Sequence, residues 1–223
     1  KEYQKAKDCY EKAIEINPSH ENAYYNLGAI FVDLKEYQKA KDCYEKAIEI
    51  NPNLAQAYNN IGLILSLEGK IKKAVNFYEK AIKINPTYAD AHNNLAKGFK
   101  ELGEYTKAKD YFEKTIEIDP NHLSAYSNLA NLFYLIGEFH KAKECFEKAI
   151  QIKPGNVHTS NGLLKSLYKM DDKSNLFKEL DSIIKEDKMN AVIGSIFSRT
   201  EVKYGVKKEN PFCNDPLNYV LKT

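Results

Sequence analysis

Apolar and polar residues between positions 21 and 154 recur with the spacing of short amphipathic helices. The helices come in pairs, and the whole pattern returns every 34 residues. Five prolines show the interval, because each lies 34 residues after the one before it: Pro18, Pro52, Pro86, Pro120 and Pro154. A fixed interval of this length is typical of a repeat architecture. We number the repeat so that its proline is position 32.

The first predicted helix of each repeat carries its apolar stripe at positions 4, 7, 8 and 11. Position 7 is always Leu or Ile, and position 11 is Phe or Leu. Position 8 is small in every complete repeat: Gly28, Gly62, Ala96 and Ala130. A small residue here favours close approach of a neighbouring helix. His92 stands where the other repeats have Tyr at position 4, and we expect it to be packed or hydrogen-bonded.

A turn and a second helix complete the repeat. Position 15, in the turn, is Gly69, Gly103 or Gly137, and glycine suits the left-handed conformation that ends many helices. Lys35 has this place in the first complete repeat, so it must adopt that conformation or use another turn. The second helix has small residues at positions 20 and 27 and an aromatic residue at 24. An Asn-Pro or Asp-Pro pair ends it in the first three complete repeats, and Lys153-Pro154 stands there in the fourth.

Small residues at 8, 20 and 27, large ones at 4, 7, 11 and 24, and proline at 32 together resemble the tetratricopeptide repeat. The resemblance covers roughly residues 1–154. It implies an all-α fold, a right-handed superhelical solenoid of antiparallel helix pairs with a 34-residue period. The departures are mild: no Trp at position 4, and Thr115 at position 27 where Ala is usual.

The expected organisation follows from the repeat boundaries. Residues 1–20 hold the second helix of a truncated repeat, whose apolar face lacks a preceding helix. After Pro154 the pattern weakens, as expected of repeats that cap a solenoid, with a further helix starting near Asn190. The segments are 1–20, complete repeats at 21–54, 55–88, 89–122 and 123–156, divergent capping helices at 157–204, and an extended tail at 205–223.

Composition narrows the class of function. Charged residues make up 29% of the 223 residues and the net charge is only +2, which gives no electrostatic basis for binding nucleic acid. No apolar run is long enough to span a bilayer, so we expect no membrane partner. Three of the four cysteines share one repeat position and lie too far apart for disulfides, which favours a reducing, cytoplasmic location.

Catalysis finds little support. The five histidines are scattered, and no phosphate-binding loop, metal motif or nucleophile elbow occurs. We expect no cofactor and no metal, and we expect this chain not to be an enzyme. The stretch from Asn210 to Tyr219 faintly resembles a junction that leads into an oxygenase-type domain in some bacterial repeat proteins.

Asparagine fills position 6 of all four complete repeats: Asn26, Asn60, Asn94 and Asn128. The family resemblance implies that this side of the first helix lines a concave groove. Each amide can pair with both backbone groups of an extended peptide, and the column resembles the asparagine ladder in the repeats of O-linked sugar transferases. The alternative is that these residues are family background, copied by recent duplication. The other predicted groove residues are Asn59 and Asn93 on its flank, together with Asn22, Lys97 and Asn131.

Three functions remain open. The first is a protein-interaction scaffold that holds an extended peptide or a partner segment in the groove. The second is the substrate-recruiting arm of a larger enzyme, whose oxygenase- or transferase-type domain lies beyond the C-terminus. The third is end-to-end self-assembly of the solenoid through the N-terminal half-repeat.

Overall fold

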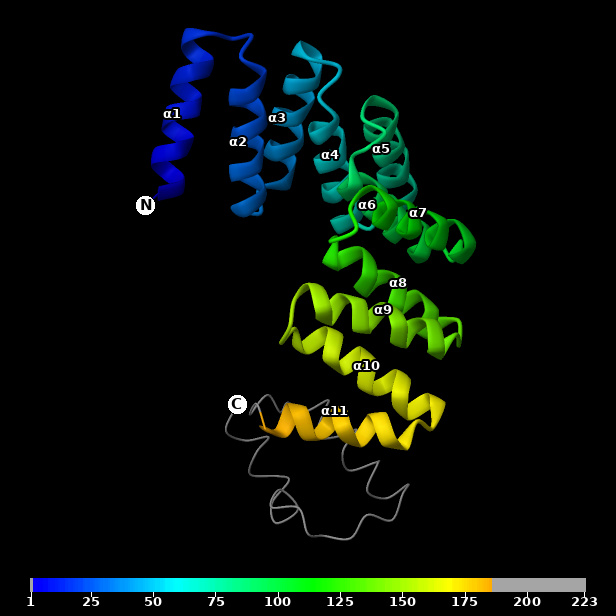
Figure 1. Ribbon diagram of the computed structural model, residues 1–223. Coiled ribbons are helices and arrows are strands. Elements are labelled where there is room, and N and C mark those ends of the chain that lie inside the picture. Colours follow the sequence, from blue (N-terminus) through cyan, green and yellow to red (C-terminus); the bar gives the residue numbers. More distant parts are fainter. Residues whose placement is uncertain (1, 186–223) are drawn as a thin grey trace. The chain divides into compact units, whose positions relative to one another are not determined.

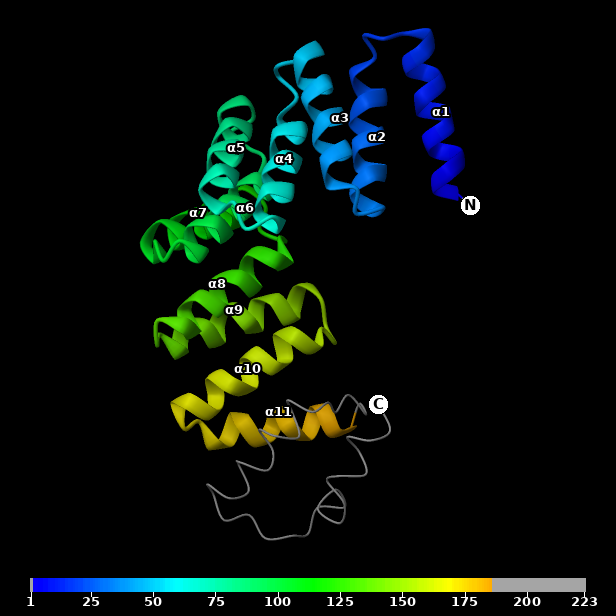
Figure 2. The same cartoon turned by 180° about the vertical axis from the view of Figure 1, so that it is seen from behind.

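A computed structural model describes residues 2–185 and, within them, the side chains of residues 3–172 and 174–180. This part of the chain is helical, with no strand. The helix predicted to start near Asn190 and the predicted tail at 205–223 lie outside it. The chain divides into two compact units, the first ending at His122 and the second beginning at Leu123. Consecutive helices within each unit lie side by side and run in opposite directions (Figures 1 and 2).

The helices alternate between the two places in the repeat. We call the helix at positions 1–13 the first helix and that at positions 17–30 the second helix. The first helices are α2 (Glu21–Asp33), α4 (Ala55–Leu67) and α6 (Ala89–Glu101) in unit 1, and α8 (Leu123–Leu135) and α10 (Val157–Met170) in unit 2. The second helices are α1 (Glu2–Ile16), α3 (Tyr37–Ile50), α5 (Ile71–Ile84) and α7 (Tyr105–Ile118) in unit 1, and α9 (Phe139–Ile152) and α11 (Lys173–Lys185) in unit 2. The fold is therefore a helical solenoid of helix pairs.

The turn inside each repeat uses one left-handed residue at position 15. Gly69, Gly103 and Gly137 have φ between 74° and 84°. Lys35 adopts the same left-handed conformation with φ 60°. Of the two alternatives expected for this residue, it therefore tolerates the geometry and keeps the turn. Asp171 ends α10 in the same way with φ 61°. A side chain with a Cβ costs about 1–2 kcal/mol in this conformation, so Lys35 and Asp171 hold local strain.

The turn between repeats is closed by the residue before the proline. The side-chain oxygen of Asn51 accepts a hydrogen bond from the backbone N–H of Asn53 at 3.1 Å. Equivalent bonds of 3.0–3.1 Å recur at Asn17, Asn85 and Asp119. Asn51 itself is extended, with φ −127° and ψ 91°, as expected for a residue that precedes proline. The Asx-Pro pair therefore both ends the second helix and fixes the turn.

Close packing at position 8 fixes the distance between the two helices of a repeat. A Cβ added to Gly28 would lie 2.7 Å from the ring of Tyr44, and one added to Gly62 would lie 2.6 Å from the ring of Tyr78. The third and fourth repeats combine alanine with phenylalanine instead, at Ala96 with Phe112 and Ala130 with Phe146, and all four residues are buried. Glycine thus occurs opposite tyrosine, where an added Cβ would have to displace the ring, and alanine occurs opposite phenylalanine.

The departures from the family pattern are accommodated in the core. His92 is buried, its Nε2 lies 2.9 Å from the carbonyl oxygen of Pro86, and its ring lies against Tyr111, so the packed role predicted for it is confirmed. Because a carbonyl only accepts, Nε2 carries the hydrogen, and Nδ1 is buried without a partner. Thr115 is buried and donates its hydroxyl to the Tyr111 carbonyl at 2.8 Å.

One ion-pair group joins the first two complete repeats. The carboxylate of Glu68 accepts hydrogen bonds from Lys41 Nζ at 2.8 Å and from Lys70 Nζ at 2.7 Å. These two lysines hold the pKa of the Glu68 carboxyl below its usual 4.5. Lys41 comes from α3 and Glu68 follows α4, so the contact links neighbouring repeats.

Candidate functional site

The first helices of unit 1 present the side chains predicted to line the groove, and we call this surface the first-helix face. α4 contacts α6 directly, so these helices form neighbouring rows of that face. Positions 2 and 13 are exposed in each of the three repeats, at Asn22, Asp33, Gln56, Leu67, Asp90 and Glu101. Position 9 is half-buried, at Ala29, Leu63 and Lys97. Leu67 is the most exposed apolar residue among these positions, with 66% of its surface accessible.

In unit 2 the corresponding residues come from α8. Ser124, Asn131 and Leu135 are exposed, and Asn128 is half-buried. The amide of Asn131 donates to the carbonyl of Ser127 one turn earlier at 2.8 Å, so one of its donors is already bonded within the helix. The predicted groove residues Asn128 and Asn131 thus share one helix.

The asparagines at position 6 tie adjacent repeats together. The Asn60 amide donates to two tyrosine hydroxyls of the preceding repeat, that of Tyr44 at 3.2 Å and that of Tyr25 at 3.3 Å. The Asn94 amide donates to the side-chain oxygen of Asn59 at 3.0 Å. Both asparagines are half-buried. Their amides therefore hold neighbouring first helices in register. This role differs from the predicted one, in which the amides pair with the backbone of a bound peptide.

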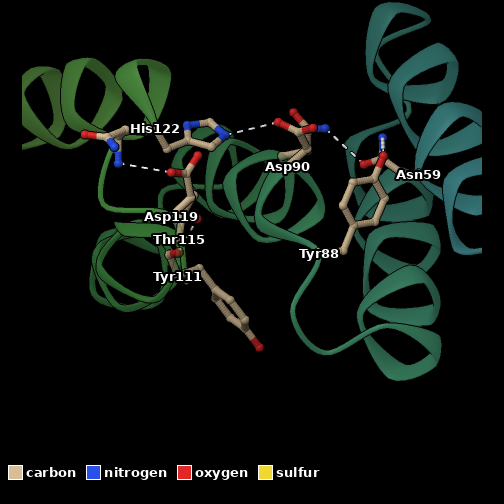
Figure 3. Close-up of polar contacts among 9 residues, drawn as sticks. Asn59, Tyr88, Asp90, Tyr111, Thr115, Asp119 and His122 are labelled. Atoms are coloured by element: carbon tan, nitrogen blue, oxygen red, sulfur yellow. Dashed lines mark hydrogen bonds and ion pairs between the residues drawn. The ribbon is translucent and has the colours of Figure 1, made fainter. Parts of the chain in front are cut away.

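The two flanking asparagines lie below the surface of the groove. Asn59 is 3% exposed and Asn93 is 6% exposed. Besides accepting from Asn94, Asn59 lies 3.5 Å from the hydroxyl of Tyr88, and Figure 3 shows the ring of Tyr88 beside it. The sequence prediction that Asn59 and Asn93 offer amides to a ligand is therefore corrected. Burial between helices leaves them no surface on which a peptide could lie.

The hydroxyl of the tyrosine at position 24 is a hydrogen-bond partner that the apolar pattern does not reveal. Tyr44 is 1% exposed, as expected of a core residue, yet its hydroxyl accepts a hydrogen bond from Asn60. Burial raises the pKa of Tyr44 above its usual 10, and it raises that of Tyr88 to about 12. Both phenols therefore stay protonated at neutral pH. The spacing in the sequence does not predict this bond by itself, since Tyr78 precedes Asn94 by the same 16 residues as Tyr44 precedes Asn60, yet Asn94 donates to Asn59.

The column of position-6 residues changes at both ends. Asn26 is half-buried, and no other described residue hydrogen-bonds to its side chain. In α10 the same position is Gly162, and a Cβ built there would lie 2.2 Å from the ring of Phe146. Phe146 thus fills the space that an asparagine side chain would need. The asparagine column stops at α10 because an aromatic ring replaces the amide.

A polar contact joins α6 to the turn after α7. His122 Nε2 lies 3.0 Å from a carboxylate oxygen of Asp90, which projects from the start of α6 (Figure 3). The Asp90 side chain is 65% exposed and that of His122 only 11%. Asp90 is thereby oriented on the first-helix face while most of its surface remains accessible.

The described residues offer no sign of a chemical site. Within residues 2–185, no group of three or more His, Cys, Asp or Glu side chains is placed to hold a metal ion. None of the helices in this range has the length and apolar character needed to cross a lipid bilayer. The thiol of Cys43 is half-buried, and burial raises its pKa to about 11, which keeps it in the unreactive protonated form.

Comparison with solved structures finds related solenoids. MamA is 26% identical, with a TM-score of 0.60 over 68% of this chain and 88% of that chain. YrrB, described as a TPR protein with an unusual peptide-binding site, is 22% identical, with a TM-score of 0.62 over 79% of this chain and 91% of that one. PilW, a type IV pilus biogenesis factor, is 20% identical, with a TM-score of 0.77 over 87% and 90%. The last two show the fold alone.

A comparison with curated proteins returns no match. Family models, in contrast, cover the repeat region. A model described as tetratricopeptide repeat matches residues 21–54 and 55–88, and a second with that description matches residues 87–154. A model described as TPR repeat matches residues 1–35. Together with the helix pairs and the left-handed turns, these matches show that the chain belongs to the tetratricopeptide repeat family.

Proposed function

We propose that this protein is an interaction scaffold that binds an extended segment of a partner protein across the first-helix face of unit 1. The observation that carries the proposal is Leu67, which leaves 66% of its surface exposed on a face whose other exposed residues are polar. Half-buried Leu63 lies one turn before it on α4. An apolar side chain of the partner that covered both leucines would remove their surface from water.

Polar groups lie on the same face as the two leucines. Gln56 is exposed near the start of α4, and half-buried Lys97 stands at position 9 of α6. Neither side chain has a hydrogen-bond or ion-pair partner among the described residues. An amide offers two donors and an acceptor, and an ammonium offers three donors. These groups suit the backbone carbonyls and acidic side chains of an extended chain, whereas the leucines supply apolar contact.

The position-6 asparagines have a narrower part in this proposal than the sequence suggested. Asn60 and Asn94 are bonded to the neighbouring repeat. Asn26 keeps its amide for a ligand, and exposed Asn22 lies one turn before it on α2. The relative YrrB, with its peptide-binding site, supports peptide recognition as a role for this fold.

The partner is unidentified, so the test starts from a random twelve-residue peptide library displayed on phage. The full chain is used for selection, and an enriched peptide is labelled and its affinity measured by fluorescence anisotropy. Leu67→Lys should weaken binding at least tenfold, because a charge then replaces the apolar contact. The matched control is Thr106→Lys on α7, an exposed position where the second repeat already carries Lys72. This control should bind as the unmodified protein does.

Two results contradict the proposal. One is a selection that enriches no peptide above an unrelated protein of the same charge. The other is an enriched peptide that binds Leu67→Lys and the unmodified protein equally well. Both variants should retain the thermal unfolding midpoint of the unmodified protein within about 2 °C, since surface substitutions usually change stability by less than about 0.5 kcal/mol.

A further inference from the structure

The outer side of α5 differs from that of the other second helices. Lys73 is followed after three and four residues by Asn76 and Phe77, and Lys80 and Lys83 follow at further intervals of three residues, which places these side chains on one side of the helix. We call these five residues the α5 stripe. Phe77 is half-buried and the other four are exposed. α5 is a second helix, so the stripe is separate from the first-helix face.

Neighbouring repeats neutralise the same side with acidic residues. Positions 22 and 29 hold Asp42 and Glu49 in α3, and Asp110 and Glu117 in α7. Lys46 pairs with Glu49 at 2.6 Å, and the equivalent pair in α7 is 2.9 Å apart. In α5 these positions hold Asn76 and Lys83, so neither position is acidic and position 29 has changed the sign of its charge.

A local excess of positive charge results. α5 contains four lysines and one glutamate, whereas α3 and α7 each contain three lysines and three acidic residues. In the part of the chain that the structure describes, Lys73, Lys80 and Lys83 form no ion pair. The charge is therefore open to a ligand of opposite sign, while the chain as a whole stays near neutral at +2.

The α5 stripe also lines a hollow in the surface. A surface hollow of about 410 Å³ is lined by the five stripe residues and Glu79. Lys80 Nζ lies 5.1 Å from the centre of the Phe77 ring and 6.0 Å from that of Tyr58, within the range of a cation–π interaction. The rings favour one position of this ammonium between the other two lysines. A partly oriented charge loses less side-chain freedom when a ligand binds.

We propose that the α5 stripe is a second docking surface, which binds an acidic segment of a partner protein. Lys73 and Lys83 are ten residues apart, or about 15 Å along the helix. An extended chain covers that distance in about five residues at roughly 3.3 Å each. The matching segment carries Asp or Glu about every third residue, with an apolar side chain between them over Phe77.

The charges favour a protein over the other anionic partners. Nucleic-acid binding needs a broader basic surface than three lysines on one helix. An anionic membrane holds proteins best when apolar side chains also insert, and Phe77 is half-buried. A short acidic segment fits three lysines spread over three turns.

The test returns the stripe to the residues of its neighbours. Asn76→Asp combined with Lys83→Glu gives α5 the acids that α3 has at these positions. The probe is a fluorescein-labelled twelve-residue peptide with Glu at every third position and a central Leu. Anisotropy in 50 mM NaCl should show at least tenfold weaker binding to this double variant than to the unmodified chain. A peptide with Gln in place of Glu should not bind either protein measurably.

A matched control separates the stripe from net charge. Thr106→Asp combined with Lys114→Glu changes the net charge by the same three units, but on α7. It should bind the acidic peptide within twofold of the unmodified chain. Equal loss of binding in both double variants, or no loss in the α5 variant, overturns the proposal.

Competition identifies the class of partner. Tighter binding of a twelve-nucleotide single-stranded DNA, or of vesicles with 30% phosphatidylserine, contradicts a protein partner. A dimer in sedimentation equilibrium that the α5 variant abolishes assigns the surface to a second copy of this chain and also contradicts it. Binding of the library-selected peptide to the first-helix face should be unchanged in the α5 variant. The two proposed binding surfaces are therefore tested independently of each other.

Discussion

Replacing Asn60 with alanine tests whether the position-6 asparagines hold the repeats together. Its amide donates to the hydroxyls of Tyr44 and Tyr25 in the preceding repeat, at 3.2 and 3.3 Å. If these bonds are structural, Asn60→Ala weakens the junction between repeats. If the asparagines serve only a ligand, the variant is as stable as the unmodified protein.

The magnitude follows from the bonds and from burial. Each hydrogen bond contributes about 0.5–1.5 kcal/mol to the free energy of unfolding. Tyr44 is 1% exposed, so water does not replace the lost donor at its hydroxyl. We expect Asn60→Ala to lower the free energy of unfolding by about 2 kcal/mol. For a chain of this size, that loss corresponds to a fall in the unfolding midpoint of about 4–8 °C.

Asn26→Ala is the matched control, because Asn26 has the same place in its repeat and no described side-chain hydrogen bond. Its cost should stay below about 0.5 kcal/mol. Urea unfolding followed by circular dichroism measures both variants. Tyr44→Phe completes a double-mutant cycle, in which the pair should be coupled by about 1 kcal/mol. Equal stability of Asn60→Ala and Asn26→Ala, or additive effects in the cycle, would refute the inter-repeat role.

Three further changes have defined outcomes. Gly28→Ala should lower stability by about 1 kcal/mol, because overpacking against Tyr44 outweighs the better helix propensity of alanine; Tyr44→Phe in the same chain should reduce that cost in thermal unfolding. Lys35→Gly should raise stability by about 0.5 kcal/mol, because glycine removes the strain at φ 60° but is more flexible when unfolded. Glu68→Gln should cost less than about 1 kcal/mol at pH 7. Since its lysine partners lower the pKa of Glu68 in the folded state, their stabilising contribution is present above pH 4.5 and is lost as the pH falls through the folded-state pKa. Urea unfolding should therefore show a smaller difference in unfolding free energy between Glu68→Gln and the unmodified protein at pH 3 than at pH 7.

The repeat interval predicted the fold because local features repeat with it. Apolar spacing placed the helices, and the missing glycine at position 15 singled out Lys35 before its conformation was known. Such features depend only on residues within one repeat, so a single sequence contains them.

The site was harder to predict because it depends on contacts between repeats. A helical wheel places position 5 beside position 6, but it does not show how deeply the next helix covers each one. Asn59 is consequently buried although it is polar and adjacent to the predicted groove. The bond from Asn60 to Tyr44 joins residues of different repeats, and its geometry is set by their packing. The enzyme-arm, self-assembly and cytoplasmic hypotheses remain predictions.

Hydrogen exchange with a bound library-selected peptide shows directly whether the first-helix face of unit 1 binds an extended partner segment. Mass spectrometry of the full chain, with and without the peptide, compares amide protection in each helix. If the peptide lies on this face, protection increases in α2, α4 and α6, centred on the turn of α4 that contains Leu67. Added protection confined to α3, α5 and α7, or spread equally over all helices, would contradict binding at this face.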